Sequence, residues 1–250
     1  MEGVPNSPSL RRRLHDFFYA EEVPYGLALV RICVPLSLLI AAVPRWRFAR
    51  ELYSSDGAPA PLWVNFGYPD WLPVPSGSMA VALMTLQILV LTAVCVGWKT
   101  RFSSLAAMVL VAYIGLLDSI GTLTKYTCVS THIFLLLALS PCATLWSVDA
   151  WLERRHVRWP GELNGGYRRH PVWTRRLMQC FIGIVYFGAA ITKMQTPAFF
   201  SGDQLYFWLI TNVNCPNPLG EMMSLWPPIL VGMGLGTIVW EIVFPFLCWR

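Results

Sequence analysis

The chain has 250 residues, of which 55% are hydrophobic and only 13% are charged. Because a soluble domain carries roughly 25% charged residues, this composition excludes an ordinary soluble protein, and the mean hydropathy of +0.49 agrees. The formal net charge is +5, but Lys and Arg gather in a few segments between long apolar runs. Such clustering sets the orientation of membrane spans and gives no support for nucleic-acid binding.

Residues 1–25 form a polar N-terminal segment with one short amphipathic stretch, LRRRLHDFFYA. We expect this stretch to lie on the cytoplasmic surface of the membrane. Arg11–Arg13 are followed by only a short, mixed run, so the segment lacks the apolar core and cleavage site of a secretory signal peptide.

Six apolar runs follow, and each approaches the roughly 17–25 residues that a membrane-spanning helix needs. The predicted spans are residues 26–43, 79–97, 102–120, 128–146, 175–193 and 229–249. We expect Pro44 and the RWRFAR run to end the first span. The loop 45–78, rich in Pro, Gly and Trp, is expected to lie in the interface as a re-entrant or a capping segment, and the stretch DQLYFWLITNV to form a short interfacial helix. The predicted fold class is an all-α integral membrane protein with about six transmembrane helices, interfacial helices and no soluble domain. Residues 26–250 form its single multi-span membrane domain.

The distribution of positive charge predicts that both termini are cytoplasmic. Of the 19 Lys and Arg residues, thirteen then fall on the inner side, five on the outer side and Arg31 inside the first span. Arg45, Arg47 and Arg50 count against this orientation. We expect a multi-pass protein of the plasma or inner membrane in a bacterium, or of the endoplasmic reticulum in a eukaryote.

Three ionisable residues fall at the same predicted depth near the outer surface: His132, Lys193 and Asp118. Ionisable groups in spans commonly mark functional sites, so their coincidence predicts an outward-facing polar pocket. Each has a simpler alternative. Lys193 can extend its amine to the lipid headgroups, His132 can bond a neighbouring helix, and Asp118 can cap its helix or pair with Lys125.

A second set of ionisable residues lies in the predicted inner half of the membrane. Arg31 is one turn into the first span, and Glu241 is well inside the sixth. Because either charge alone in hydrocarbon is costly, we predict that Arg31 and Glu241 form a structural ion pair.

The seven cysteines show neither a CxxC pair nor a metal-ligand spacing, so no metal site is expected. Cys128 and Cys215 both fall on the predicted outer side. A disulfide between them and two free thiols are both compatible with the sequence.

Six stretches, taken in chain order, carry a family resemblance: ALVRICVPL, GWKTRFSS, STHIFLLLALS, WSVDAWLERR, IVYFGAAITKMQTPAFFSGDQLYFWL and TIVWEIVFPFL. Their order and spacing resemble the HTTM (horizontally transferred transmembrane) family, which includes the membrane domain of vitamin K-dependent gamma-glutamyl carboxylase. The resemblance covers nearly the whole chain.

In the carboxylase, a lysine base deprotonates reduced vitamin K, oxygen adds to the quinol, and the strong base so formed removes a proton from a glutamate side chain. The carbanion then captures carbon dioxide. Lys193 matches that lysine, and His132 matches a histidine that supports the same chemistry. The resemblance therefore implies reduced vitamin K or another quinol as cofactor, with membrane lipid, a quinone and a peptide glutamate as partners.

The chain also departs from the family pattern. Thr192 stands where the family has a second lysine, and CVST precedes His132 where asparagines are expected. No large soluble region follows Arg250, so we expect a membrane domain that is incomplete at its C-terminal end. Quinone binding or epoxidation is thus better supported than carboxylation of peptide glutamate. The alternative is a non-enzymatic polytopic membrane protein, such as a transporter or assembly factor, although no inverted repeat is visible.

Overall fold

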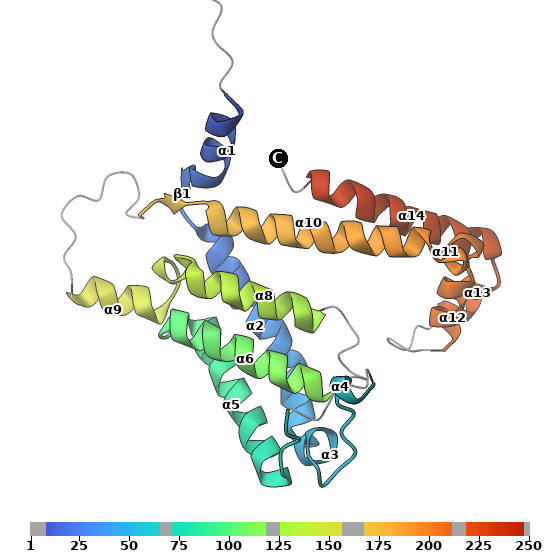
Figure 1. The fold of residues 1–250 in the computed structure, drawn as a ribbon, viewed down its shortest axis with the longest axis horizontal. Coiled ribbons are helices and arrows are strands. Elements are labelled where there is room, and N and C mark those ends of the chain that lie inside the picture. The colour runs from blue at the N-terminus through green and yellow to red at the C-terminus, as the bar shows by residue number, and fades with distance from the viewer. Residues whose placement is uncertain (1–8, 66–71, 119–125, 157–167, 212–218, 248–250) are drawn as a thin grey trace, which may run out of the picture. The chain divides into compact units, whose positions relative to one another are not determined.

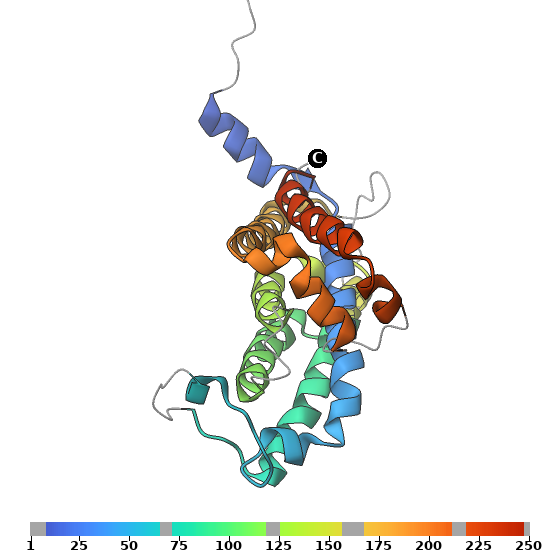
Figure 2. The same ribbon diagram turned by 90° about the vertical axis from the view of Figure 1, so that its right-hand side faces the viewer.

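A computed structural model describes residues 9–65, 72–118, 126–156, 168–211 and 219–247. Figures 1 and 2 show these described residues as helices, with one small two-stranded sheet. The chain divides into two compact units, Met1–Arg176 and Leu177–Arg250, which are called unit 1 and unit 2. Each unit is described by itself.

Unit 1 begins with helix α1 (Leu10–Tyr19) and contains most of the helices. The elements that follow are β1 (Glu21–Glu22), α2 (Tyr25–Trp46), α3 (Ala49–Tyr53), α4 (Leu62–Asn65), α5 (Gly77–Val96), α6 (Thr100–Leu117), α8 (Tyr126–Leu139), a 3₁₀ turn (Cys142–Thr144), α9 (Val148–His156) and β2 (His170–Pro171). Strands β1 and β2 pair antiparallel, which ties the N-terminal segment to the start of α10 (Trp173–Met194).

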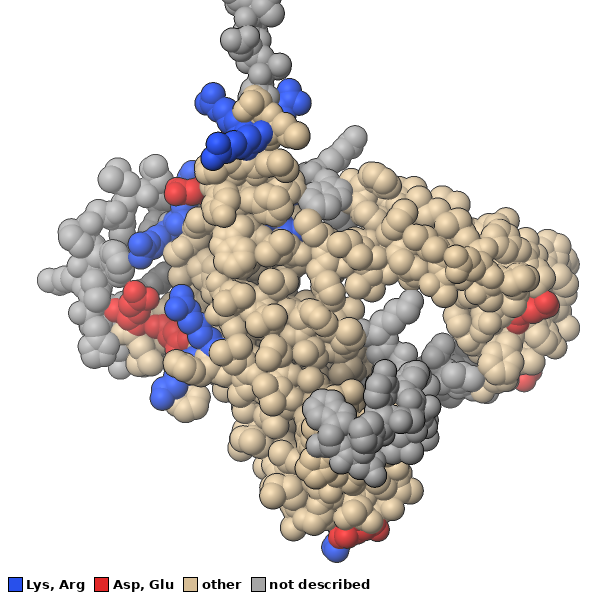
Figure 3. All heavy atoms as spheres, viewed as in Figure 1, with Lys and Arg blue, Asp and Glu red and all other residues tan. Residues whose placement is uncertain are grey.

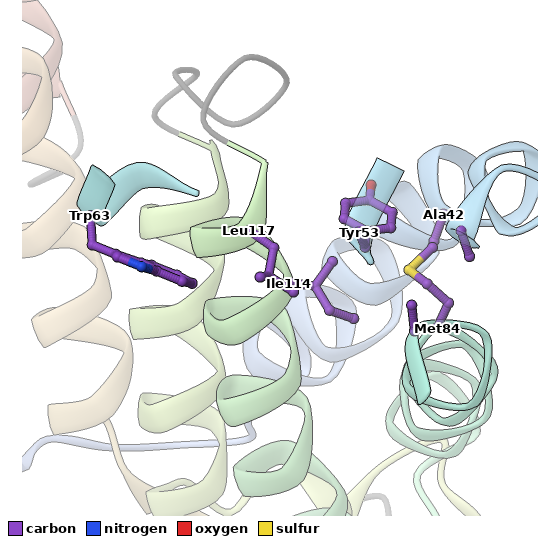
Figure 4. Close-up of a cluster of buried hydrophobic side chains, with 8 residues drawn as sticks. Ala42, Tyr53, Trp63, Met84, Ile114 and Leu117 are labelled. Atoms are coloured by element: carbon purple, nitrogen blue, oxygen red, sulfur yellow. The ribbon is translucent and has the colours of Figure 1, made fainter. Parts of the chain in front are cut away.

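Helices α2, α5, α6 and α8 form the body of unit 1. Helix α6 packs against both α5 and α8, and α2 packs against α5 (Figures 1 and 2). A core cluster at one end of these helices gathers side chains from α2 to α6 (Figure 4). Tyr53 of α3 and Trp63 of α4 belong to it and are 3% and 6% exposed. The described parts of the loop after α2 that carry Tyr53 and Trp63 are therefore packed onto the helix ends.

Unit 2 is built on the part of α10 from Leu177 onward and on α14 (Pro227–Leu247), which run side by side (Figure 1). Three short helices connect them: α11 (Pro197–Ser201), α12 (Asp203–Ile210) and α13 (Gly220–Ser224). Helix α12 is the predicted short helix in DQLYFWLITNV. Gly183 lies against Pro245, whereas Gly234 lies against Phe199, so α10 and α14 are antiparallel.

The all-α membrane fold is confirmed. Among the described residues, five helices are long and apolar enough to cross a membrane: α2, α5, α6, α10 and α14. They coincide with five of the six predicted spans. In the space-filling view, charged atoms of unit 1 gather over α1, around the α5–α6 turn and near α3, while the long sides of the helices are uncharged (Figure 3).

The predicted fourth span, 128–146, is longer than the helix found there. Helix α8 has 14 residues and ends at Leu139, which spans about 21 Å at 1.5 Å per residue. Pro141 causes the stop, because proline disfavours helical backbone in the residue before it, here Ser140. The chain then makes a 3₁₀ turn. The carbonyls of Leu145 and Trp146, which follow this turn, accept hydrogen bonds from Arg31 of α2.

The first span ends within the predicted RWRFAR run, at Trp46. Pro44 does not end α2, which continues to Trp46 with both Pro35 and Pro44 inside it. A proline removes one helical hydrogen bond but keeps a helical φ, so a last turn can form beyond it.

Candidate functional site

Lys193 lies in the last turn of α10, and its amine forms an ion pair with Oε1 of Glu241 on α14. The two side chains are largely buried, with 16% and 11% of their surface exposed. Side chains on a helix lean toward its N-terminus, so a lysine at the end of α10 can reach back to the neighbouring helix. This pairing favours a functional or structural role over an amine that only extends to headgroups.

One aromatic ring lies beside this ion pair, and further ring contacts occur in the same unit. The Lys193 amine lies 5.7 Å from the centre of the Phe199 ring, a distance at which a cation is attracted to the ring face. Tyr186 of α10 stacks on Phe244 of α14 with ring centres 4.3 Å apart. Phe199 in turn meets Trp208 edge to face at 5.7 Å. The ion pair therefore has the Phe199 ring beside its amine, and Trp208 packs against that ring.

Two glycines allow Phe199 to lie so close to α14. A Cβ atom at Gly234 would overlap the carbonyl oxygen of Phe199, so only glycine permits this approach. Gly202 adopts φ +85°, a left-handed conformation that turns the chain from α11 into α12. The sequence between α10 and α14 thus positions an aromatic ring beside the lysine.

Glu241 has further capacity to accept a hydrogen bond. The residue is 8% exposed, and its Oε2 atom has no hydrogen-bond partner among the described residues. A carboxylate can accept several hydrogen bonds, whereas the lysine amine can donate three. The pair therefore leaves one buried acceptor, Oε2, beside the lysine amine.

His132 is an exposed residue of α8 in unit 1. Its Nδ1 atom lies 2.7 Å from the carbonyl oxygen of Cys128 and 3.9 Å from the sulfur of Cys128. Because a carbonyl only accepts hydrogen bonds, Nδ1 carries the proton in the neutral ring. The second nitrogen, Nε2, is then the one with a lone pair.

Arg31 is fully buried in unit 1 and binds four backbone carbonyls. Its Nη1 donates to the oxygens of Val94 at 3.1 Å and Cys95 at 2.9 Å, at the end of α5. Its Nη2 donates to Leu145 at 3.3 Å and Trp146 at 2.7 Å, after the 3₁₀ turn. The last carbonyls of a helix lack partners within the helix and carry partial negative charge. Arg31 satisfies them and joins three segments.

The turn between α5 and α6 is shaped around Arg31. Gly97 has φ +73° and ends α5 in the left-handed conformation, and a Cβ there would overlap Arg31 Nη1 and Ser147 Cβ. Asp149 of α9 accepts hydrogen bonds from the backbone nitrogens of Lys99 and Thr100, each at 2.8 Å. The stretches GWKTRFSS and WSVDAWLERR, separate in sequence, therefore form one structural unit.

The family model of the HTTM domain matches residues 19–250 of this chain. The chain belongs to the HTTM family. Searches of curated proteins and of solved structures found no match.

In this HTTM protein, each member of the predicted Arg31–Glu241 ion pair has other partners. Glu241 pairs with Lys193 in unit 2, and Arg31 binds four carbonyls in unit 1. Arg31 thus donates its hydrogen bonds to carbonyls, and no described carboxylate forms an ion pair with it. A direct contact between Arg31 and Glu241 would join the two units and stays a prediction.

Other polar partnerships were not expected from the sequence. Arg45 pairs with Asp118 at 3.6 Å, whereas Asp118 was expected to cap its helix or pair with Lys125, which lies outside the described residues. The Lys193–Glu241 pair was also missed. In both pairs the partners are far apart in sequence, and the helical spacing that marks short-range ion pairs gives no signal at such distances.

Two further expectations concern the cysteines and a metal site. Cys128 is a free thiol, and Cys215 lies outside the described residues. Within the described ranges no three His, Cys, Asp or Glu side chains gather as metal ligands.

Proposed function

We propose that this HTTM protein is a membrane enzyme that removes a proton from a quinol-like lipid, such as reduced vitamin K, at the Lys193–Glu241 pair. The observation that supports it is a largely buried lysine–carboxylate pair on two membrane-spanning helices, beside the ring of Phe199. The family resemblance adds that Lys193 matches the base of the vitamin K-dependent carboxylase.

The residues present fit a quinol. A quinol brings a hydroxyl that can lose its proton and an apolar ring, which suits the aromatic ring of Phe199. The hydroxyl would approach the Lys193 amine, since Oε2 of Glu241 is buried. When bound, the quinol supplies the oxygen-reactive centre that drives epoxidation.

The chain's own part is to accept and hold one proton. In the ion pair the extra proton rests on the amine, which then has no lone pair. Transfer of that proton to Glu241 leaves a neutral amine and a neutral acid. Nζ then takes the hydroxyl proton, so the pair ends as an ammonium beside a carboxylic acid. In this scheme Glu241 primes Lys193, and Phe199 helps exclude water from the amine.

The proposal predicts epoxidation of reduced vitamin K by the protein in liposomes, measured by chromatography of the epoxide. Lys193→Ala should lower the rate at least about 100-fold, because a general base contributes roughly 10²–10⁴. Glu241→Gln should also lower it, whereas Lys99→Ala, at an exposed lysine, should not. Unchanged epoxidation in folded Lys193→Ala would reject the assignment, and a folded wild type without turnover would favour the non-enzymatic alternative.

Two finer points belong to the same proposal. We assign His132 a supporting role, so His132→Ala should reduce epoxidation less than Lys193→Ala. Incorporation of labelled carbon dioxide into a glutamate peptide separates carboxylation from epoxidation alone.

The proposed orientation has both termini in the cytoplasm and the site facing outward. In a cysteine-free background, a membrane-impermeant maleimide added to intact cells should label Asp56→Cys and spare Arg101→Cys. The reverse labelling would invert the orientation.

A further inference from the structure

A second candidate site lies entirely within unit 1, between α2, α5, α6 and α8. It is an open pocket with a volume of about 50 Å³, which is room for a small polar group such as a hydroxyl and not for a whole ligand. Its walls include Ala42, Met84, Val111 and Ile114, which are 2–6% exposed. Figure 4 shows Ala42, Met84, Ile114 and Tyr53 converging from four helices on this region. Most of the residues that line the pocket are uncharged.

Gln87 adds a buried amide to this apolar wall. It is 7% exposed and lines the pocket, and its Oε1 atom has no hydrogen-bond partner among the described residues. Thr85 and Thr92, on the same helix, return their hydroxyls to the carbonyls of Val81 and Ile88. The Oε1 acceptor cannot be satisfied by its own helix in this way, because the backbone N–H groups in the interior of a helix already donate to carbonyls of that helix.

An unsatisfied buried amide is destabilising, so its presence in a membrane helix needs a compensating partner. The partner that Oε1 requires is a hydrogen-bond donor, and the amide nitrogen of the same side chain can donate in return. A hydroxyl group both donates and accepts. A ligand hydroxyl therefore matches the Gln87 amide more completely than an ether or a carbonyl.

The charged residues near the pocket argue against an ionic ligand. Arg45 lines it, but its guanidinium is paired with Asp118 at 3.6 Å and is hydrogen-bonded to the Tyr53 hydroxyl. The arginine and the aspartate together carry no net charge. An anion would have to compete with Asp118, whereas an uncharged molecule leaves the pair intact.

We propose that this pocket binds the hydroxyl end of an uncharged, lipid-soluble molecule, with the hydroxyl on the Gln87 amide. The molecule's hydrocarbon part would extend along the apolar wall and out of the open side of the pocket. This site does not use Lys193 or Glu241, so a test of this proposal is independent of a test of the proposed function.

Photolabelling of the purified, full-length protein in detergent tests the proposal. The probes are a diazirine-bearing decanol, its methyl ether and the corresponding decanoic acid. The alcohol should label α5 or α6 peptides that contain Met84 or Val111, saturably and in competition with unmodified decanol. The ether, which lacks the donor, and the acid, which is charged, should label these peptides about two- to twelvefold less, since one hydrogen bond contributes about 0.5–1.5 kcal/mol.

Variants of α5 supply the matched controls. Gln87→Leu and Gln87→Met should each reduce alcohol labelling about three- to tenfold, while their thermal unfolding midpoints stay equal to or above that of the wild type, because an unsatisfied amide is gone. Thr92→Val and Lys193→Ala should leave labelling unchanged. Equal labelling by alcohol and ether, or undiminished labelling in a folded Gln87 variant, would overturn the proposal.

Discussion

Lys193 and Glu241, 48 residues apart in the chain, form an ion pair that joins α10 to α14. The pairing explains how two charges can lie on apolar, membrane-spanning helices. Removing one partner of a buried pair leaves the other uncompensated, which costs about 3–5 kcal/mol, whereas replacing both with apolar residues is often neutral.

The first prediction follows from that asymmetry. Lys193→Met and Glu241→Leu should each lower the thermal unfolding midpoint in detergent by roughly 6–12 °C, taking 3 kcal/mol and about 2–4 °C per kcal/mol. The double variant should unfold within a few degrees of the wild type. Additive losses in the double variant would mean that the two side chains do not compensate each other. The double variant should also be folded but inactive in epoxidation, which separates stability from the proposed chemistry.

The second prediction concerns Arg31. Arg31→Met leaves four carbonyls without their donor, and because hydrogen bonds to charged groups contribute about 1.5–3 kcal/mol each, we expect a loss of at least about 3 kcal/mol. Arg31→Lys keeps the charge but lacks the planar fork, so it should fall between Arg31→Met and the wild type. Arg101→Met, at an exposed position on α6, is the control. Thermal unfolding that is equal for the Arg31 and Arg101 variants would contradict this role.

The third prediction tests the turn at Gly97. Gly97→Ala should lower stability by at least about 1–2 kcal/mol, because a left-handed conformation is costly for other residues and the new Cβ overlaps Arg31 and Ser147. Gly236→Ala is the comparison, because its Cβ would meet no atom within 4 Å. There, alanine should be neutral or stabilising by up to about 1 kcal/mol. The two substitutions should therefore have opposite signs in unfolding measurements.

The fourth prediction is a pH dependence at the β1–β2 sheet. Burial, followed by the nearby Arg168, lowers the pKa of His170 below its usual value of 6.5. The folded state therefore binds fewer protons than the unfolded state between the lowered pKa and 6.5. The stability contributed by neutral His170 is present above pH 6.5 and is lost as pH falls below it.

Hydrogen exchange at the Val172 amide, which donates to the Ala20 carbonyl beside the sheet, measures this opening. Its protection factor should fall below pH 6.5 in the wild type and much less in His170→Gln. Parallel pH profiles for the two proteins would rule out His170 as the cause.

Much of the fold could be predicted from local patterns. Hydropathy located five long spans, and the stretch DQLYFWLITNV indicated α12 (Asp203–Ile210). The end of α8 was misplaced because the apolar character continues past Pro141, and hydropathy does not register the backbone restriction that proline imposes. Lys193 was identified as unusual by its depth, but its partner was not, because nothing in the sequence encodes which helices become neighbours.

The sequence by itself determined that this is an all-α membrane protein of the HTTM family, because apolar run lengths and motif order are properties of the chain. Only the tertiary structure decided where its buried charges find compensation: Arg31 on four carbonyls and Lys193 on Glu241. The physical reason is that electrostatic compensation acts over a few ångströms in space. Which groups come that close is fixed by helix packing, not by separation along the chain.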